Sequence, residues 1–155
     1  MEETKTWIEN ELPALGSDFI VSTSRQGMRS RASYGIERAV LVDCRLTIRS
    51  TIKDETGRTF TGAVAAMLKD VDVASVAPQH VPGLSGSTTD KPHTDVFIHL
   101  ATGRPKSFVE YHDDGRPSEP TDIMTIHVRD QASGERVANA VRRAAILCGA
   151  ATSPF

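Results

Sequence analysis

The chain has 155 residues, of which 39% are hydrophobic and 25% charged, and a formal net charge of −2. This length predicts a single domain over residues 1–155 that can bury a core without a structural metal. The net charge argues against a general nucleic-acid-binding protein, and no apolar run approaches the length of a membrane span. The polar and acidic start, MEETKTWIEN, is not typical of a signal peptide.

Residues 1–15 predict a short N-terminal helix and lead-in, with Thr4 as the N-cap and Pro13 as the stop. A short strand is expected in SDFIVSTS, followed by a loop in RQGMRSR. The next segment carries the clearest period-two pattern in the chain. Its alternate apolar positions are Val40, Val42, Cys44, Leu46 and Ile48. The pattern predicts one long strand with these side chains on its inward face.

The turn residues DETG at 54–57 predict a hairpin that continues into a strand around RTFTGAV. Residues 65–78 fit either a helical turn or a strand, and residues 79–93 are rich in Gly, Ser, Thr and Pro, as is typical of a loop. Further strands are expected in TDVFIHLAT and in two segments of 106–130. In the last of these, we expect Met124, Ile126 and Val128 to point inward and Thr125, His127 and Arg129 outward.

The period changes to that of a helix at the C-terminal end. Val137, Val141, Ala144 and Cys148 form one helical stripe, and Gly149 is a good helix stop. We therefore predict an amphipathic capping helix at 134–149. The whole order predicts an α+β, mainly antiparallel fold of six or seven strands, arranged as a bent sheet or partly open barrel that the helix closes.

This order resembles the pleckstrin-homology-like (PH-like) superfamily and is similar to a poorly characterised bacterial group of small PH-like domains. The segments that carry the resemblance are Trp7 in the first helix, VLVDCRLTI with its central Cys44, MLKDVDVASV, and ERVANAVRRAAILC, which ends in Cys148. PH-like domains bind phosphoinositides, peptides or partner proteins, and few are enzymes. The resemblance implies a non-catalytic binding or interaction module with no cofactor and no catalytic residue. A protein or peptide is the leading partner, and a homodimer is a further expectation.

A second hypothesis is a phosphate-binding or anionic-lipid-binding module. In lipid-binding PH domains, basic residues near the first strand-to-strand loop hold inositol phosphates, and Arg25, Arg29, Arg31 and Arg38 occupy a comparable place here. Guanidinium groups suit phosphate because they donate paired, charge-assisted hydrogen bonds. Solvated charge on the face of a sheet is the simpler interpretation, so anionic lipid is not the favoured partner.

A third hypothesis is a metal-assisted enzyme. His99 and His127 would share an outer face if their strands pair, and His112 stands beside Asp113 and Asp114 near a turn. Imidazole and carboxylate together suit a divalent metal. No His-x-His or His-Glu-x-x-His spacing is present, so we assign no metal ligand from the sequence.

Cys44 and Cys148 are the two cysteines of the chain, one on the predicted long strand and one on the predicted capping helix. Whether they meet depends on the register of the strand. If they do, they form either a pair of packed free thiols or a disulfide that joins helix to sheet, and the sequence leaves both open. A disulfide would indicate export to an oxidising compartment after removal of a signal, whereas free thiols would indicate the cytoplasm.

Overall fold

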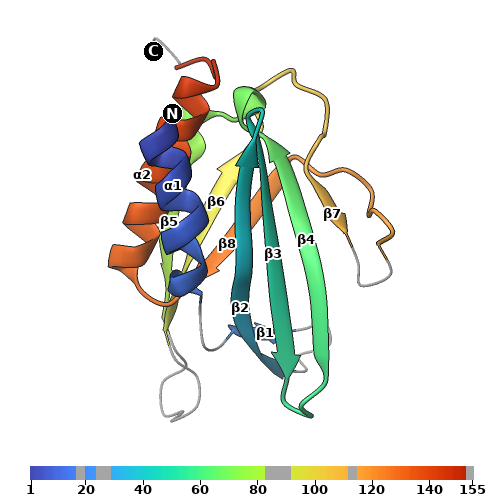
Figure 1. Cartoon of the computed structure of the whole chain (residues 1–155). Helices are drawn as coiled ribbons and strands as arrows, with labels where there is room; N and C mark the ends of the chain where they lie inside the picture. Colours follow the sequence, from blue (N-terminus) through green and yellow to red (C-terminus); the bar gives the residue numbers. More distant parts are fainter. Residues whose placement is uncertain (17–19, 24–28, 83–91, 112–114, 153–155) are drawn as a thin grey trace.

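Two antiparallel sheets form most of the molecule in the part of the chain that the computed structural model describes. Residues 17–19, 24–28, 83–91, 112–114 and 153–155 lie outside this part. The larger sheet has the order β1-β2-β3-β4-β7 and the smaller one the order β5-β6-β8 (Figure 1). The α+β, mainly antiparallel class is therefore confirmed. The described strands do not close into a barrel.

The strands follow one another along most of the chain. In the larger sheet they are β1 (Ile20–Thr23), β2 (Arg29–Val42), β3 (Arg45–Asp54), β4 (Thr59–Met67) and β7 (Val109–Tyr111). In the smaller sheet they are β5 (Ala77–Val81), β6 (His93–His99) and β8 (Ile123–Val128). Two short 3-10 helices, η2 (Leu68–Asp70) and η3 (Val73–Ser75), occupy the segment whose sequence fits either a helix or a strand.

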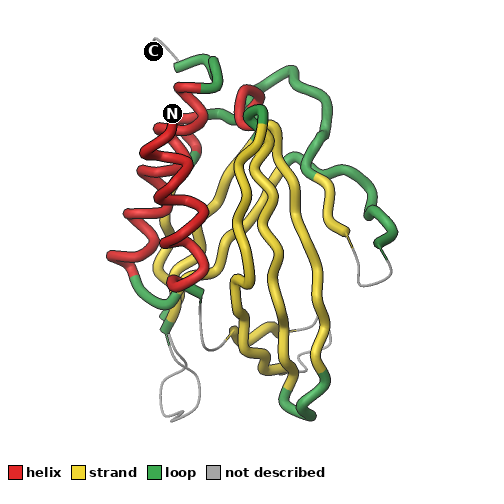
Figure 2. Tube along the Cα trace, viewed as in Figure 1, coloured by secondary structure: helices red, strands yellow, loops and turns green. Residues whose placement is uncertain are grey.

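Two α-helices lie side by side next to the sheets (Figure 2). The first, α1 (Glu2–Glu11), begins after Met1 and continues as the 3-10 helix η1 (Leu12–Leu15). Thr4 is a buried residue inside α1, so its prediction as the N-cap is wrong. The C-terminal helix, α2 (Gln131–Leu147), packs against β5, β6 and α1. Its N-cap is Asp130, whose carboxylate accepts a hydrogen bond from the Ser133 amide at 2.7 Å.

The predicted long strand around Cys44 is in fact a tight hairpin, which corrects the expectation from the sequence. β2 ends at Val42, β3 begins at Arg45, and the two residues between them, Asp43 and Cys44, have φ of 47° and 63°. Two central residues with positive φ match the twist of the flanking strands in a hairpin. Glycine or asparagine usually marks such a turn, and this turn has neither at its second position.

The hairpin reverses the numbering parity of the inward side chains. Leu41 pairs with Leu46 across the ladder, so near the turn the inward residues are odd-numbered on β2 and even-numbered on β3. Val42, predicted to point inward, is 53% exposed, whereas Leu41 is buried. Leu46 and Ile48 are buried as predicted. All three residues from Val40 to Val42 are apolar, so the sequence does not reveal this switch.

A β-bulge interrupts β2 near its middle. The register shifts between Ile36, which pairs with Ser50, and Arg38, which pairs with Arg49, and this leaves Glu37 as the extra residue. The carboxylate of Glu37 forms an ion pair with Arg49 at 3.0 Å. A bulge of this kind bends the strand and increases its twist. Here it lies close to the boundary between a packed half and an open half of the larger sheet.

The hydrophobic core lies between α1, α2 and the two sheets. Its largest fully buried side chains include Ile8, Leu46, Ile48, Phe108, Ile126 and Val128. The predicted stripe of α2 is confirmed at Val137, Val141 and Ala144, and the inward residues of β8 are confirmed at Met124, Ile126 and Val128. The helix approaches β6 closely at Gly134, where an added Cβ would lie 2.5 Å from Cγ2 of Thr94.

A disulfide joins Cys44 to Cys148, with a Cα–Cα distance of 5.6 Å and a separation of 104 residues. Of the two states that the sequence leaves open, the structure therefore has the bridge. It connects the β2–β3 turn to the residue that caps the C-terminal end of α2. None of the described helices has the length and hydropathy needed to cross a membrane.

Candidate functional site

A cleft of about 460 Å³ lies at the open half of the larger sheet. Strands β2, β3 and β4 supply its floor, β7 supplies one wall, and β8 supplies another. The residues that line it are Tyr34, Ser50, Ile52, Phe60, Thr61, Gly62, Ala63, Val64, Glu110, Tyr111, Thr125 and His127. This cleft combines apolar, aromatic and polar side chains in one concave site, which makes it the best candidate for a binding site among the described residues.

The cleft exists because the inner face of the larger sheet extends beyond the core. On β3, Leu46 and Ile48 are buried, Ser50 is half-buried and Ile52 is 39% exposed. Phe60, which pairs with Ile52 from β4, is 44% exposed. These alternate residues share one face of the sheet. Apolar side chains therefore continue along this face into a region that the rest of the fold does not cover.

Tyr34 joins the core to the floor of the cleft. Its side chain is almost fully buried, and its ring lies edge-on to His127 with 4.9 Å between the ring centroids. Burial raises the pKa of the Tyr34 hydroxyl, a hydrogen bond with Ser50 opposes this shift, and the negative charge of Glu110 adds to it. The hydroxyl consequently stays protonated at neutral pH and can donate a hydrogen bond beside the cleft.

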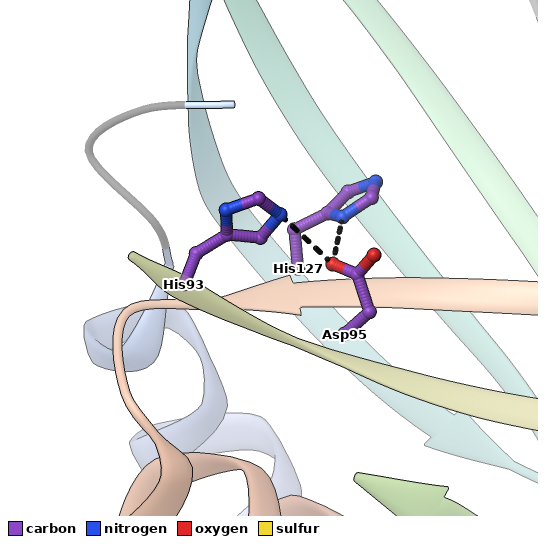
Figure 3. Close-up of polar contacts among 3 residues, drawn as sticks. All are labelled: His93, Asp95 and His127. Atoms are coloured by element: carbon purple, nitrogen blue, oxygen red, sulfur yellow. Dashed lines mark hydrogen bonds and ion pairs between the residues drawn. The ribbon is translucent and has the colours of Figure 1, made fainter. Parts of the chain in front are cut away.

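Two histidines and an aspartate, His93, His127 and Asp95, meet in one cluster (Figure 3). Asp95 Oδ1 lies 2.6 Å from Nδ1 of His127 and 3.3 Å from Nε2 of His93. Asp95 and His127 are direct partners in the β6–β8 ladder, and His93 lies two residues before Asp95 on β6. Residues two apart on a strand project from the same face. The cluster is thus held by the backbone of two neighbouring strands.

Accessibility decreases from one end of this cluster to the other. The side chain of His127 is 25% exposed and lines the cleft, that of Asp95 is 15% exposed, and that of His93 is only 6% exposed. A ligand in the cleft would therefore meet His127 first.

The wall formed by β7 is of mixed character. Tyr111 is half-buried, and its hydroxyl accepts a hydrogen bond from Arg45 at 3.1 Å. The neighbouring Glu110 is exposed, and within the described part of the chain its carboxylate makes no ion pair. Phe108, just before β7, is fully buried.

The side chains of the predicted cluster of Arg25, Arg29, Arg31 and Arg38 lie mostly outside the described part of the chain. Arg25 lies outside the described residues, and the side chains of Arg29 and Arg31 lie outside them as well. Arg38 is exposed on β2 and stands beside Arg49 in the ladder. Phosphate binding by these arginines stays a prediction.

The histidines that the sequence analysis grouped are also placed differently. His127 lies in the cluster, but His99 is exposed at the other end of β6, opposite Ile123. His112, Asp113 and Asp114 lie outside the described residues. The partners of His127 are instead Asp95 and His93, which the sequence analysis did not select.

The missing signal was the sequence HTD at 93–95. His-x-Asp, like His-x-His, puts two metal-binding or hydrogen-bonding side chains on one face of a strand. The contribution of Tyr34 could not be read in the same way, because it depends on the β2 bulge and on contact between different sheets.

Comparisons with protein-family models, with curated proteins and with solved structures find no match to this chain. The function is therefore argued from the cleft itself.

Proposed function

We propose that the protein is a non-catalytic binding module whose cleft receives a large apolar side chain from a peptide segment of a partner protein. The observation that carries this proposal is the exposure of Ile52 and Phe60, at 39% and 44%, on the rim of a concave site. Exposed apolar residues that gather around a cleft are a feature of interaction sites, whereas single exposed ones are ordinary.

The size and lining of the cleft suit an inserted side chain. Its volume of about 460 Å³ lies within the range of about 300–1,000 Å³ that is typical of ligand pockets. Phe60, Tyr34 and Tyr111 supply aromatic surface, and aromatic residues are enriched at the centres of protein interfaces. Ser50, Thr125 and His127 add a small number of polar groups that can orient a peptide backbone.

Charge at the cleft favours a particular neighbour for the inserted side chain. The exposed carboxylate of Glu110 is part of the lining. A basic residue next to the apolar anchor could pair with it and would determine the direction of the bound segment more than its affinity. The proposed ligand is therefore a peptide with a large apolar residue followed or preceded by Lys or Arg.

Two further features support the wider setting of this proposal. The succession of two antiparallel sheets and a final helix, α2, is consistent with a PH-like architecture, and such domains serve as scaffolds for binding. The Cys44–Cys148 disulfide supports a location in an oxidising compartment, because cytosolic reductants keep most thiols reduced.

The test is a selection of random dodecapeptides on the immobilised protein, followed by affinity measurement with a labelled synthetic peptide. Ile52→Ala is the cleft variant, and Ile123→Ala is its matched control, since both isoleucines are 39% exposed and only Ile52 lines the cleft. We expect Ile52→Ala to weaken binding by about tenfold or more, which corresponds to the loss of a central apolar contact. Ile123→Ala should leave the affinity unchanged.

The proposal is overturned if no peptide is enriched, or if both variants bind the selected peptide as tightly as the unaltered protein does. Selected peptides that lack a large apolar residue would contradict the proposed anchor. An excess of Lys or Arg beside that anchor, lost when selection is repeated on Glu110→Gln, would support the role of Glu110.

A further inference from the structure

We propose that His93, Asp95 and His127 form a binding site for a divalent transition-metal ion, with Zn²⁺ as the reference ion. One ligand atom from each residue lies within 4.8 Å of the other two. The inference goes beyond the peptide-binding proposal and shares one residue with it, His127, which also lines the cleft. Metal binding and peptide binding are measured separately, so either proposal can fail without the other.

The positions of the three atoms are close to those that a metal requires. Zn²⁺ binds imidazole nitrogen and carboxylate oxygen at about 2.0–2.2 Å, which places neighbouring ligand atoms about 3–3.5 Å apart. Nε2 of His93 already lies 3.3 Å from Oδ1 of Asp95. Nδ1 of His127 lies at 2.6 Å and would have to move away by less than about 1 Å.

The backbone holds this arrangement before any metal enters. Asp95 and His127 are paired in the ladder between β6 and β8, and His93 projects from the same face of β6 as Asp95. The Tyr34 ring packs edge-on against His127 and limits its rotation. A ligand set on strands of a sheet is more precisely placed than one on loops, so little ordering would accompany metal binding.

The donor set selects the class of metal. Two imidazoles and one carboxylate suit Zn²⁺, Fe²⁺, Ni²⁺ or Cu²⁺, whereas Mg²⁺ and Ca²⁺ prefer sets made of oxygen. Three protein ligands leave at least one coordination position for water or another molecule, as in metal sites that take part in chemistry or ligand binding. His127 is the most exposed of the three and lines the cleft, so the open position would be reached from there.

A hydrogen-bonded cluster without metal is the competing interpretation, because Asp95 can accept one N–H from each imidazole. The two interpretations differ in a measurable way. The metal site predicts saturable binding of one ion per chain, whereas the hydrogen-bonded cluster predicts none at these residues.

The protein is stripped with a chelator, returned to chelator-free buffer and titrated with Zn²⁺ by calorimetry, with Mg²⁺ as the control ion. We expect one Zn²⁺ site per chain and no Mg²⁺ binding. Asp95→Asn retains an acceptor oxygen for the histidines but loses the charge, and it should weaken Zn²⁺ binding by about 100-fold, since even outer partners of ligands contribute about 10–100-fold. His99→Ala, which changes an exposed histidine on the same strand, should bind as the unaltered protein does.

A second measurement needs no variant. Addition of Co²⁺, which is paramagnetic, should broaden the ring signals of His93 and His127 in a ¹H–¹⁵N spectrum before it affects those of His80 and His99. The proposal is overturned by an absence of one-to-one Zn²⁺ binding. It is also overturned if Asp95→Asn binds unchanged, or if Co²⁺ broadens all four histidines together.

Discussion

The inner face of the larger sheet has two halves that share the same strands but differ in how far their apolar side chains are buried. In one half, Leu41, Leu46 and Ile48 are buried beneath the rest of the fold, and the disulfide joins the adjacent turn to α2. In the other half, Ile52 and Phe60 stand 39% and 44% exposed around the cleft. The same strands pass through both halves, and the bulge at Glu37 lies near the boundary.

This difference shows that the alternation of apolar and polar residues along a strand identifies the inner face of a sheet. It does not show which part of that face other elements cover. Ile48 and Ile52 have the same residue type, strand and face, yet one is 1% and the other 39% exposed. Apolar surface in the packed half stabilises the fold, since burial contributes roughly 25 cal/mol per Å². In the open half the same kind of surface is available for a ligand.

The largest expected effect concerns the bridge that secures the packed half. Replacing both cysteines, as Cys44→Ser with Cys148→Ser, should lower the free energy of unfolding by about 4–5 kcal/mol, because the bridge closes a loop of 104 residues in the unfolded chain. Chemical denaturation with and without a thiol reductant measures this. The double variant serves as the control, since reductant should not alter it. Equal denaturation midpoints for the oxidised and reduced wild type would contradict the expected contribution.

The direct comparison of the two halves uses two isoleucines four residues apart on β3. Ile48→Ala should cost about 2–5 kcal/mol of stability, because it leaves a cavity in the core. Ile52→Ala should cost about 1 kcal/mol or less, because the side chain keeps much of its contact with water when folded. Denaturant unfolding of both variants provides the measurement. Similar losses for the two would show that the open half is packed in solution.

The smallest expected effect lies at the start of α2, beside the packed half. The hydrogen bonds from Ser133 to Asp130, first from its amide and then from its hydroxyl, lower the pKa of the Asp130 carboxyl. A lowered pKa in the folded state gives stability that is present above the unfolded value of about 4 and is lost as the pH falls through the folded value. Asp130→Ala should therefore cost about 1 kcal/mol at neutral pH and less in acid.

Thermal unfolding at several pH values measures this effect. Asp130→Asn keeps an oxygen that can cap the helix but does not titrate, so its cost at neutral pH should be smaller than that of Asp130→Ala and should fall by the same amount in acid. A cost of Asp130→Ala that is the same at neutral and acid pH would contradict the assigned cause.

Periodicity predicted much of the fold and little of the site. The predictions for the apolar stripe of α2 and for the inward residues of β8 were correct. In both segments polar residues separate the apolar ones, so the spacing of the apolar residues distinguishes a helix from a strand. The β2–β3 turn was missed because Cys44 occupies a position where glycine would have signalled it. The cluster of His93, Asp95 and His127 depends on the register of β6 against β8, and no tight turn joins these two strands to set that register in the sequence.

The close contact between α2 and β6 at Gly134 has a consequence for the cluster on the other face of β6. The helix touches β6 at Thr94, and the strand presents His93 and Asp95 on its opposite face, one residue to either side. Any side chain at position 134 would have to displace Thr94 or lift the helix. We thus expect a side chain at position 134 to alter the spacing of His93, Asp95 and His127 from the opposite side of the sheet. A screen of variants for altered site geometry should therefore include this helix as well as the cleft.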